Sequence, residues 1–185
     1  MTQPTTNTSN NTLGLTYGLI GGLSISVFTL LLYVGGLKYY VSGLAFIPFF
    51  IVGTLAVLAG LQLKKQSGGY LSTAEALKVV FTVFVLSFLL QLLFNYILLN
   101  YIDIPFRDAV TQYTVDKAEQ VMKRFGAPDS DIEKMRVSAS DPKNYSLGRL
   151  LLSYSMWCIL YFIISVIIAL IIRKKRPPFE NSFNQ

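Results

Sequence analysis

The chain has 185 residues, of which 52% are hydrophobic and 14% charged, and its formal net charge is +6. An average soluble domain is roughly 25% charged, so this composition argues against a soluble class. A single cysteine, Cys158, excludes a disulfide within the chain. The absence of histidine excludes a Ser-His-Asp triad and a histidine-ligated zinc site.

The apolar residues are collected into four runs, and each is long enough for the roughly 20 residues that cross a bilayer. These predicted spans cover residues 13–37, 41–63, 77–101 and 150–172. They define a membrane domain over residues 13–172, and residues 1–12 form a polar tail that we expect to be disordered. Residues 173–185 form a basic C-terminal tail.

The first two predicted spans are joined by a tight turn at Lys38-Tyr39-Tyr40, which we expect at the membrane interface. Pro48 lies inside the second predicted span, where it should kink or locally open the helix. Ser72 and Glu75 form a capping-box pattern at the start of the third helix, because each side chain reaches a backbone N–H that the helix leaves unpaired.

Residues 103–144 are the only sizeable segment outside the predicted spans, and their pattern is helical. Apolar residues recur at helical spacing from Phe106 to Phe125, and Gly126 and Pro128 then predict a helix stop. Ser130 with Glu133 predicts a second capping box, and Glu119 with Lys123 an ion pair on the solvated side. We expect a helical hairpin lying over the ends of the spans, with Asp103 as a cap or anchor.

The basic residues predict the orientation of the spans. They cluster in the second loop and behind the last span, at Lys64, Lys65, Arg173, Lys174, Lys175 and Arg176. Short cytoplasmic segments carry an excess of Lys and Arg, so we predict that both termini are cytoplasmic and that the hairpin lies outside. A basic cluster directly after a span is typical of membrane orientation, and we therefore predict no nucleic-acid partner.

Two stripes within the spans are candidate sites. Gly14, Gly18, Gly22 and Ser26 recur at four-residue steps, which lets two helices approach closely, either within the chain or between it and a partner. Ser87, Gln91 and Asn95 form a polar stripe that must face the bundle interior or a cavity. We expect this stripe to form hydrogen bonds between helices, with hydroxyls such as those of Tyr154 and Tyr161 as partners, or to line a path for a solute.

Three segments resemble a bacterial family, known mainly from Bacteroidota, that is catalogued as domain of unknown function 4199. The first is Leu71-Ser72-Thr73-Ala74-Glu75-Ala76-Leu77-Lys78-Val79-Val80. The second joins Lys117-Ala118-Glu119-Gln120, Gly126-Ala127 and Ile132-Glu133-Lys134-Met135. The third is Ile167-Ile168-Ala169-Leu170-Ile171-Ile172-Arg173-Lys174-Lys175. At Thr73-Ala74 and Val80 this chain departs from the Phe-Gly and Gly that are usual in the family. The resemblance implies a four-span inner-membrane protein of a Gram-negative bacterium with a periplasmic loop, and it implies no activity.

The sequence thus predicts an all-α integral membrane protein with four transmembrane helices and an extracytoplasmic helical hairpin between the third and fourth. With no histidine and no charged residue in the middle of a span, we expect no enzymatic activity and no catalytic, cofactor-binding or metal-binding residues. The function favoured first is an accessory component that contacts the bilayer and associates with a second copy or an envelope protein. The alternative is a small oligomeric transporter or lipid-handling protein.

Overall fold

The computed structural model describes residues 6–174, with side chains from Thr12 onward. Apart from a backbone bridge between Leu71 and Lys174, the regular structure in this range is helical. The four long apolar helices are α1 (Thr6–Val34), α3 (Ile47–Gln66), α4 (Thr73–Ile97) and α7 (Leu147–Ile172). The other elements are α2 (Leu37–Tyr40), η1 (Gly43–Phe46), η2 (Leu98–Ile102), α5 (Ile104–Arg124), α6 (Asp129–Ala139) and η3 (Pro142–Tyr145).

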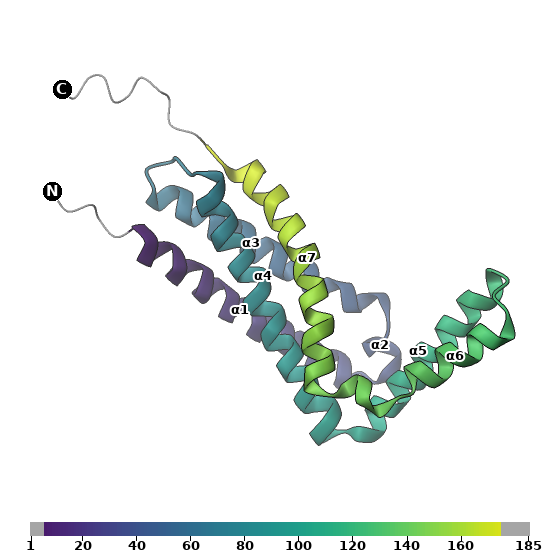
Figure 1. Ribbon diagram of the computed structural model, residues 1–185. Coiled ribbons are helices and arrows are strands. Elements are labelled where there is room, and N and C mark those ends of the chain that lie inside the picture. Colours follow the sequence, from purple (N-terminus) through teal and green to yellow (C-terminus); the bar gives the residue numbers. More distant parts are fainter. Residues whose placement is uncertain (1–5, 175–185) are drawn as a thin grey trace, which may run out of the picture.

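Helix α4 is the centre of the arrangement (Figure 1). It packs against α1, α3 and α7, whereas α1 and α7 lie on different sides of it. The start of α1, the turn between α3 and α4 and the end of α7 lie together at one end of the bundle, which we call the terminal end. The α5–α6 hairpin leaves the opposite end, which we call the hairpin end.

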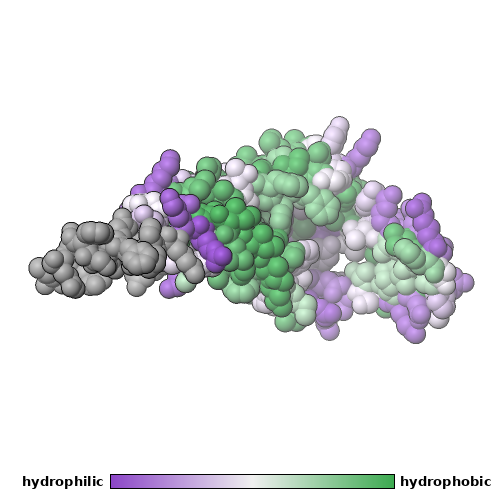
Figure 2. Space-filling view, turned by 90° about the horizontal axis from the view of Figure 1, so that it is seen from above, coloured by the Kyte–Doolittle hydropathy of each residue, from purple (hydrophilic) through white to green (hydrophobic). Residues whose placement is uncertain are grey.

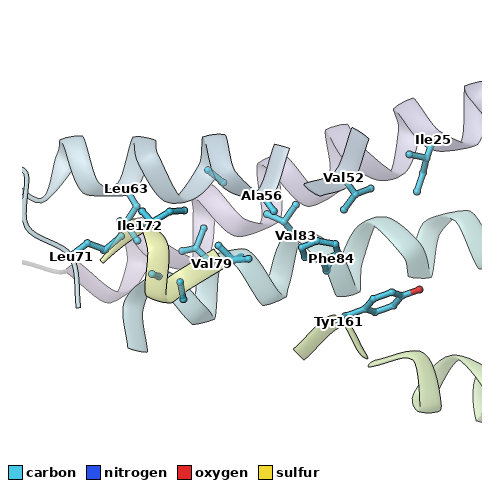
Figure 3. Close-up of a cluster of buried hydrophobic side chains, with 14 residues drawn as sticks. Ile25, Val52, Ala56, Leu63, Leu71, Val79, Val83, Phe84, Tyr161 and Ile172 are labelled. Atoms are coloured by element: carbon cyan, nitrogen blue, oxygen red, sulfur yellow. The ribbon is translucent and has the colours of Figure 1, made fainter. Parts of the chain in front are cut away.

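The buried core lies along α4 and is closed by the three helices around it (Figure 3). Val79, Val83 and Phe84 of α4 are buried beneath residues of α1, α3 and α7. Towards the hairpin end the core becomes aromatic, since the rings of Phe88 and Tyr161 stack with centroids 4.7 Å apart. Lipid tails are as apolar as these side chains, so van der Waals packing between the helices, rather than removal of apolar surface from water, must hold them together.

Large apolar side chains also cover the outside of the bundle (Figure 2). The exposed fraction is 66% for Leu23, 74% for Phe50 and 77% for Ile171. A helix that is apolar all round fits the bilayer and not water. Four such helices, each long enough to cross the hydrocarbon, make this chain a multi-pass membrane protein.

The largest differences from the predicted boundaries are at the starts of the first and second long helices. Helix α1 begins at Thr6, before the predicted start at residue 13, so residues 6–12 of the tail that we expected to be disordered are helical. Residues 1–5 lie outside the described residues. The second long helix begins at Ile47 rather than at residue 41, after the short elements α2 and η1. Pro48 therefore occupies the first turn, where no backbone donor is lost, and the expected kink is absent from α3.

The start of α4 confirms the predicted capping box. The backbone N–H of Glu75 donates to the hydroxyl of Ser72, and that of Ser72 donates to the Glu75 carboxylate at 3.1 Å. The corresponding prediction for the hairpin is wrong. Pro128 precedes the first residue of α6 and no side chain caps it, so Ser130 and Glu133 lie inside the helix.

The predicted pair of helices over residues 103–144 is present as α5 and α6, but it projects from the hairpin end instead of lying over the ends of the spans (Figure 1). At its base, Asp103 caps α5 by accepting from the N–H of Phe106 at 2.9 Å, and it also accepts from the Tyr33 hydroxyl at 2.8 Å. Between the helices, Val115 and Ile132 are buried. Glu119 faces α6, not only solvent, because it pairs with Arg136 as well as with Lys123.

We expect Glu119→Gln to loosen α6 from α5. Hydrogen bonds from Lys123 and then from Arg136 lower the pKa of the Glu119 carboxyl, so the ionised form is the one that the hairpin stabilises. A lowered pKa in the folded state gives stability that is present at neutral pH and is lost as the pH falls through that pKa. Hydrogen exchange of the α6 amides should therefore be faster in the variant at neutral pH, with the difference from wild type vanishing in acid.

The matched control is Asp131→Asn, which removes an ion pair that Asp131 forms with Lys134 within α6 alone. This variant should exchange like wild type throughout α5 and should lose little protection in α6. Equal exchange in Glu119→Gln and wild type at neutral pH would contradict the role given to Glu119.

Candidate functional site

The glycine stripe of α1 lies against α4 of the same chain. A Cβ atom added to Gly18 would lie 2.9 Å from the Cβ of Leu86, and one added to Gly14 would lie 3.1 Å from the Cβ of Thr82. Gly22 is covered in the same way by Leu90. Of the two arrangements that the sequence left open for these glycines, the structure has the contact within the chain.

The last member of the stripe is less enclosed. Ser26 follows Gly22 on α1 and is half-buried. Gly21, which the four-residue spacing missed, is buried, and a Cβ atom there would collide with the Ser87 hydroxyl. The close approach of the helices therefore follows two adjacent rows of small residues rather than one.

Each residue of the polar stripe of α4 forms a hydrogen bond, and the partners come from the chain's N-terminal part. Ser87 donates to the carbonyl oxygen of Gly18 at 3.0 Å, and Gln91 donates to the Thr29 hydroxyl at 3.0 Å. The Tyr40 hydroxyl donates to Asn95 at 3.0 Å. Burial raises the pKa of Tyr40 to about 12, so this donor keeps its proton at neutral pH.

The partners proposed on α7 do not fill this role. Tyr154 instead donates to the backbone carbonyl of Val85 at 2.5 Å, and Tyr161 stacks on Phe88. The α7 tyrosines do not pair with the polar stripe because α1 covers the face of α4 that carries Ser87. Within the described residues, no buried side-chain nitrogen or oxygen lacks a hydrogen-bond partner.

A cavity of about 290 Å³ opens between α4 and α7 on the side of Gln91 and Asn95 that faces away from α1. It reaches the π-helical turn η2 at Asn100 and the short element η3 at Tyr145. The remaining polar lining consists of tyrosine and serine hydroxyls and the Trp157 indole N–H on α4 and α7, and none of the lining residues is charged. Single π-helical turns of this kind often occur at functional sites.

A second cavity of about 440 Å³ adjoins the first, since the two share Phe88, Gln91, Trp157 and Tyr161 as lining residues. It lies between α3, α4 and α7 and is bounded on the α3 side by Phe49. A third cavity of about 460 Å³ continues from it along α3 and α7, and its lining is almost wholly apolar. The three cavities form one series that grades from polar at the hairpin end to apolar in the middle of the bundle.

The cavities lie between α3 and α7, which pack closely near the terminal end and further along touch through the Phe49 and Tyr161 rings, with centroids 6.3 Å apart. At the terminal end the Lys64 ammonium donates to the carbonyl oxygen of Ile172 at 2.8 Å, and Gly60 lies beneath the Ile172 side chain. Further along, α3 and α7 separate, and Phe84 and Phe88 of α4 form the floor between them.

Arg107 of α5 contacts two residues that line the polar end of the first cavity, Asn100 and Tyr145. Its guanidinium lies 5.3 Å from the centre of the Tyr145 ring and contacts the side-chain oxygen of Asn100 at 3.5 Å. The Tyr145 hydroxyl is also hydrogen-bonded to Thr111 of α5 at 2.6 Å. The base of the hairpin therefore positions one wall of the cavity.

Several lining residues escaped prediction from the sequence. Trp157 lines two of the cavities and is the only tryptophan in the chain, but a lone aromatic residue in an apolar run carries no positional signal. Tyr145 lies in a loop whose path the sequence does not specify. The spacing did identify Gln91 and Asn95, because polar groups in hydrocarbon must find partners.

The topology-setting basic residues that the structure describes gather at the terminal end. Lys64 and Lys65 end α3, while Arg173 and Lys174 follow α7. Lys175 and Arg176 lie outside the described residues. Among residues 6–174 no group of three His, Cys, Asp or Glu side chains could hold a metal ion.

These features define the class of the chain: a helical membrane protein of four spans with a helical hairpin before the last. Residues 16–174 match the family described as "Protein of unknown function (DUF4199)", and the chain belongs to this family. No curated protein and no solved structure matches the chain. The family description names no activity, so function must be argued from the cavities and surfaces themselves.

We expect Gly18→Ala to lower the free energy of unfolding by about 1–3 kcal/mol, the usual cost of overpacking a closely packed contact. The added methyl group would meet the Cβ of Leu86, which cannot move without the backbone of α4. Thermal unfolding in detergent measures the change. Gly53→Ala is the control, since a Cβ atom on Gly53 has no neighbour within 4 Å. Equal unfolding of the Gly18 and Gly53 variants would contradict the close contact.

Proposed function

We propose that this protein binds a membrane lipid in the series of cavities between α3, α4 and α7 and is a lipid-handling protein without enzymatic activity. One observation carries the proposal, namely the change from polar to apolar lining along cavities that share lining residues. Amides and hydroxyls at the hairpin end suit a polar headgroup, while Phe49, Phe84 and Ile164 further in suit an acyl chain.

The absence of charge in the cavity lining favours a lipid over an ion. Transport of ions or protons usually needs an ionisable residue within the membrane, and all three cavities are lined by uncharged side chains. A neutral amphiphile from the surrounding bilayer needs no such group. Uncharged amides and hydroxyls also offer little for acid–base or nucleophilic catalysis, which supports a non-enzymatic function.

The sequence favoured an accessory role first and a transporter or lipid-handling protein second, and the proposal here reverses that ranking. Self-association through the glycine stripe was the main support for an accessory role, and α4 covers Gly14, Gly18 and Gly22 within the chain. A second observation still supports association with a partner. The hairpin projects from the bundle (Figure 1), and Phe125 at its tip is 87% exposed. An accessory role through the hairpin is therefore the second candidate function.

Trp157 provides a direct test of the lipid proposal. The protein would be loaded with a phospholipid brominated in the middle of its acyl chains, washed in detergent and compared with protein loaded with the unbrominated lipid. Because Trp157 is the only tryptophan and lines two of the cavities, we expect quenching that survives the wash. Mass spectrometry of the washed protein should find the lipid retained.

Ser153→Phe and Ser155→Phe form a matched pair for this test. Both serines lie on α7, but only Ser153 lines the cavity. The first variant should lose most of the retained lipid and of the bromine-dependent quenching, and the second should behave like wild type. Loss of quenching from wild type on washing would show ordinary annular lipid and would overturn the proposal.

We further propose that the protein resides in the bacterial inner membrane with the terminal end in the cytoplasm and the hairpin outside. The gathering of Lys64, Lys65, Arg173 and Lys174 at one end of the bundle supports this orientation. The basic residues near the spans at the hairpin end are Lys38, Arg107, Lys143 and Arg149, and Arg107 is paired with Asp108.

Labelling of single cysteines tests the orientation. In a Cys158→Ser background, Phe125→Cys should react with a membrane-impermeant maleimide once the outer membrane is permeable, because the tip of the hairpin is exposed. Gln66→Cys, at the end of α3, should react only after the inner membrane is disrupted. The reverse pattern would contradict the orientation. A bifunctional reagent on Phe125→Cys that captures one defined envelope protein would favour the second candidate function.

A further inference from the structure

A fourth hollow, of about 780 Å³, lies at the terminal end, far along the bundle from the polar cavity at Tyr145. It is bounded by α1, α3 and the residues that follow α7. Three of its lining residues are lysines, namely Lys64, Lys65 and Lys174. Neither the packing of the core nor the lipid proposal above uses this hollow.

Local structure holds the lysines in place. The backbones of Leu71 and Lys174 pair through two hydrogen bonds of 2.9 and 3.0 Å, which bring the end of α7 beside the turn before α4. Lys64 donates to the carbonyl oxygen of Ile172, and the Lys174 ammonium lies 5.6 Å from the centre of the Tyr70 ring. The ion pairs found among the described residues all lie in the α5–α6 hairpin, so no described carboxylate neutralises these three lysines.

The other wall of the hollow is apolar and faces the bilayer. Leu58 and Leu61 line it from α3 and keep exposed fractions of 47% and 40% on the lipid-facing surface. Between the leucines and the lysines, Tyr17 donates to the Gln62 side chain at 2.5 Å and joins α1 to α3. The hollow is therefore basic at the level of the membrane surface and apolar towards the hydrocarbon.

We infer that this hollow binds the headgroup of an anionic phospholipid from the leaflet at the terminal end. The phosphate is held by Lys65 and Lys174, and an acyl chain lies along Leu58 and Leu61. Basic pockets between transmembrane helices favour anionic headgroups, because the ammonium groups neutralise the phosphate where water is partly excluded. A free phosphate ion would satisfy the lysines but would leave the apolar wall uncovered, and so the lipid is the ligand that fits both walls.

This site is independent of the lipid proposal for α3, α4 and α7. It lies at the other end of the bundle and shares only Leu58 with the third of those cavities. It selects for charge through its lysines, whereas the cavities between α3, α4 and α7 have no charged lining. One site can therefore fail its test without affecting the other.

The test is a titration of the purified protein in detergent with dioleoyl phosphatidylglycerol and, separately, with dioleoyl phosphatidylcholine, followed by native mass spectrometry. Wild type should bind the anionic lipid more tightly. Lys65→Gln and Lys174→Gln should each weaken that binding about five-fold, the effect expected for one basic residue near an anionic headgroup. Both variants keep Lys64, whose contact with Ile172 secures α7, so we expect unchanged thermal unfolding without lipid.

Lys78→Gln is the matched control, because Lys78 lies near the start of α4 at the same end but does not line the hollow. It should bind both lipids like wild type. Equal affinity of wild type for the two lipids would overturn the inference, as would a loss in Lys78→Gln as large as in the other two variants. Displacement of the lipid by millimolar inorganic phosphate would also overturn it, since the acyl chain would then contribute nothing.

Discussion

The close contact between α1 and α4 determines how the other helices can pack. At Gly18 the two backbones lie so near that the Ser87 hydroxyl of α4 reaches the carbonyl oxygen of α1. In a bilayer this distance matters more than it would in water, because dispersion forces and hydrogen bonds must hold helices together where the hydrophobic effect does not. The glycines provide the short distance, and the hydroxyl satisfies a polar group that hydrocarbon would leave unpaired.

Once α1 occupies this face of α4, the polar stripe has two sides with different surroundings. One side of Gln91 is hydrogen-bonded to Thr29 of α1, while the other faces the space between α4 and α7. Helix α7 has neither a glycine-rich face against α3 nor a polar partner there beyond Lys64, so past the terminal end the two helices diverge and touch through the Phe49 and Tyr161 rings. The cavities between α3, α4 and α7 result from this divergence and not from any special loop.

The two ends of the molecule differ in chemistry in a way that follows from the same arrangement. At the hairpin end, uncharged amides and hydroxyls line the polar cavity, and the base of α5 buttresses it through Arg107 and Tyr145. At the terminal end, lysines line a hollow whose other wall faces lipid. The proposed function and the site inferred at the terminal end therefore call for amphiphiles of different charge, neutral at the hairpin end and anionic at the terminal end.

The sequence by itself determined the four spans, the helical hairpin, the capping box at Ser72 and the presence of close-packing glycines, because these depend on local composition and spacing. It missed the first-turn position of Pro48, since α2 and η1 delay the start of α3 and no local signal marks them. Only the tertiary structure decided which helix covers the glycines, which side of Gln91 meets a cavity and where Trp157 and Tyr145 lie. Those choices depend on contacts between residues far apart in the chain, and one sequence contains the small and polar residues without stating which surfaces meet.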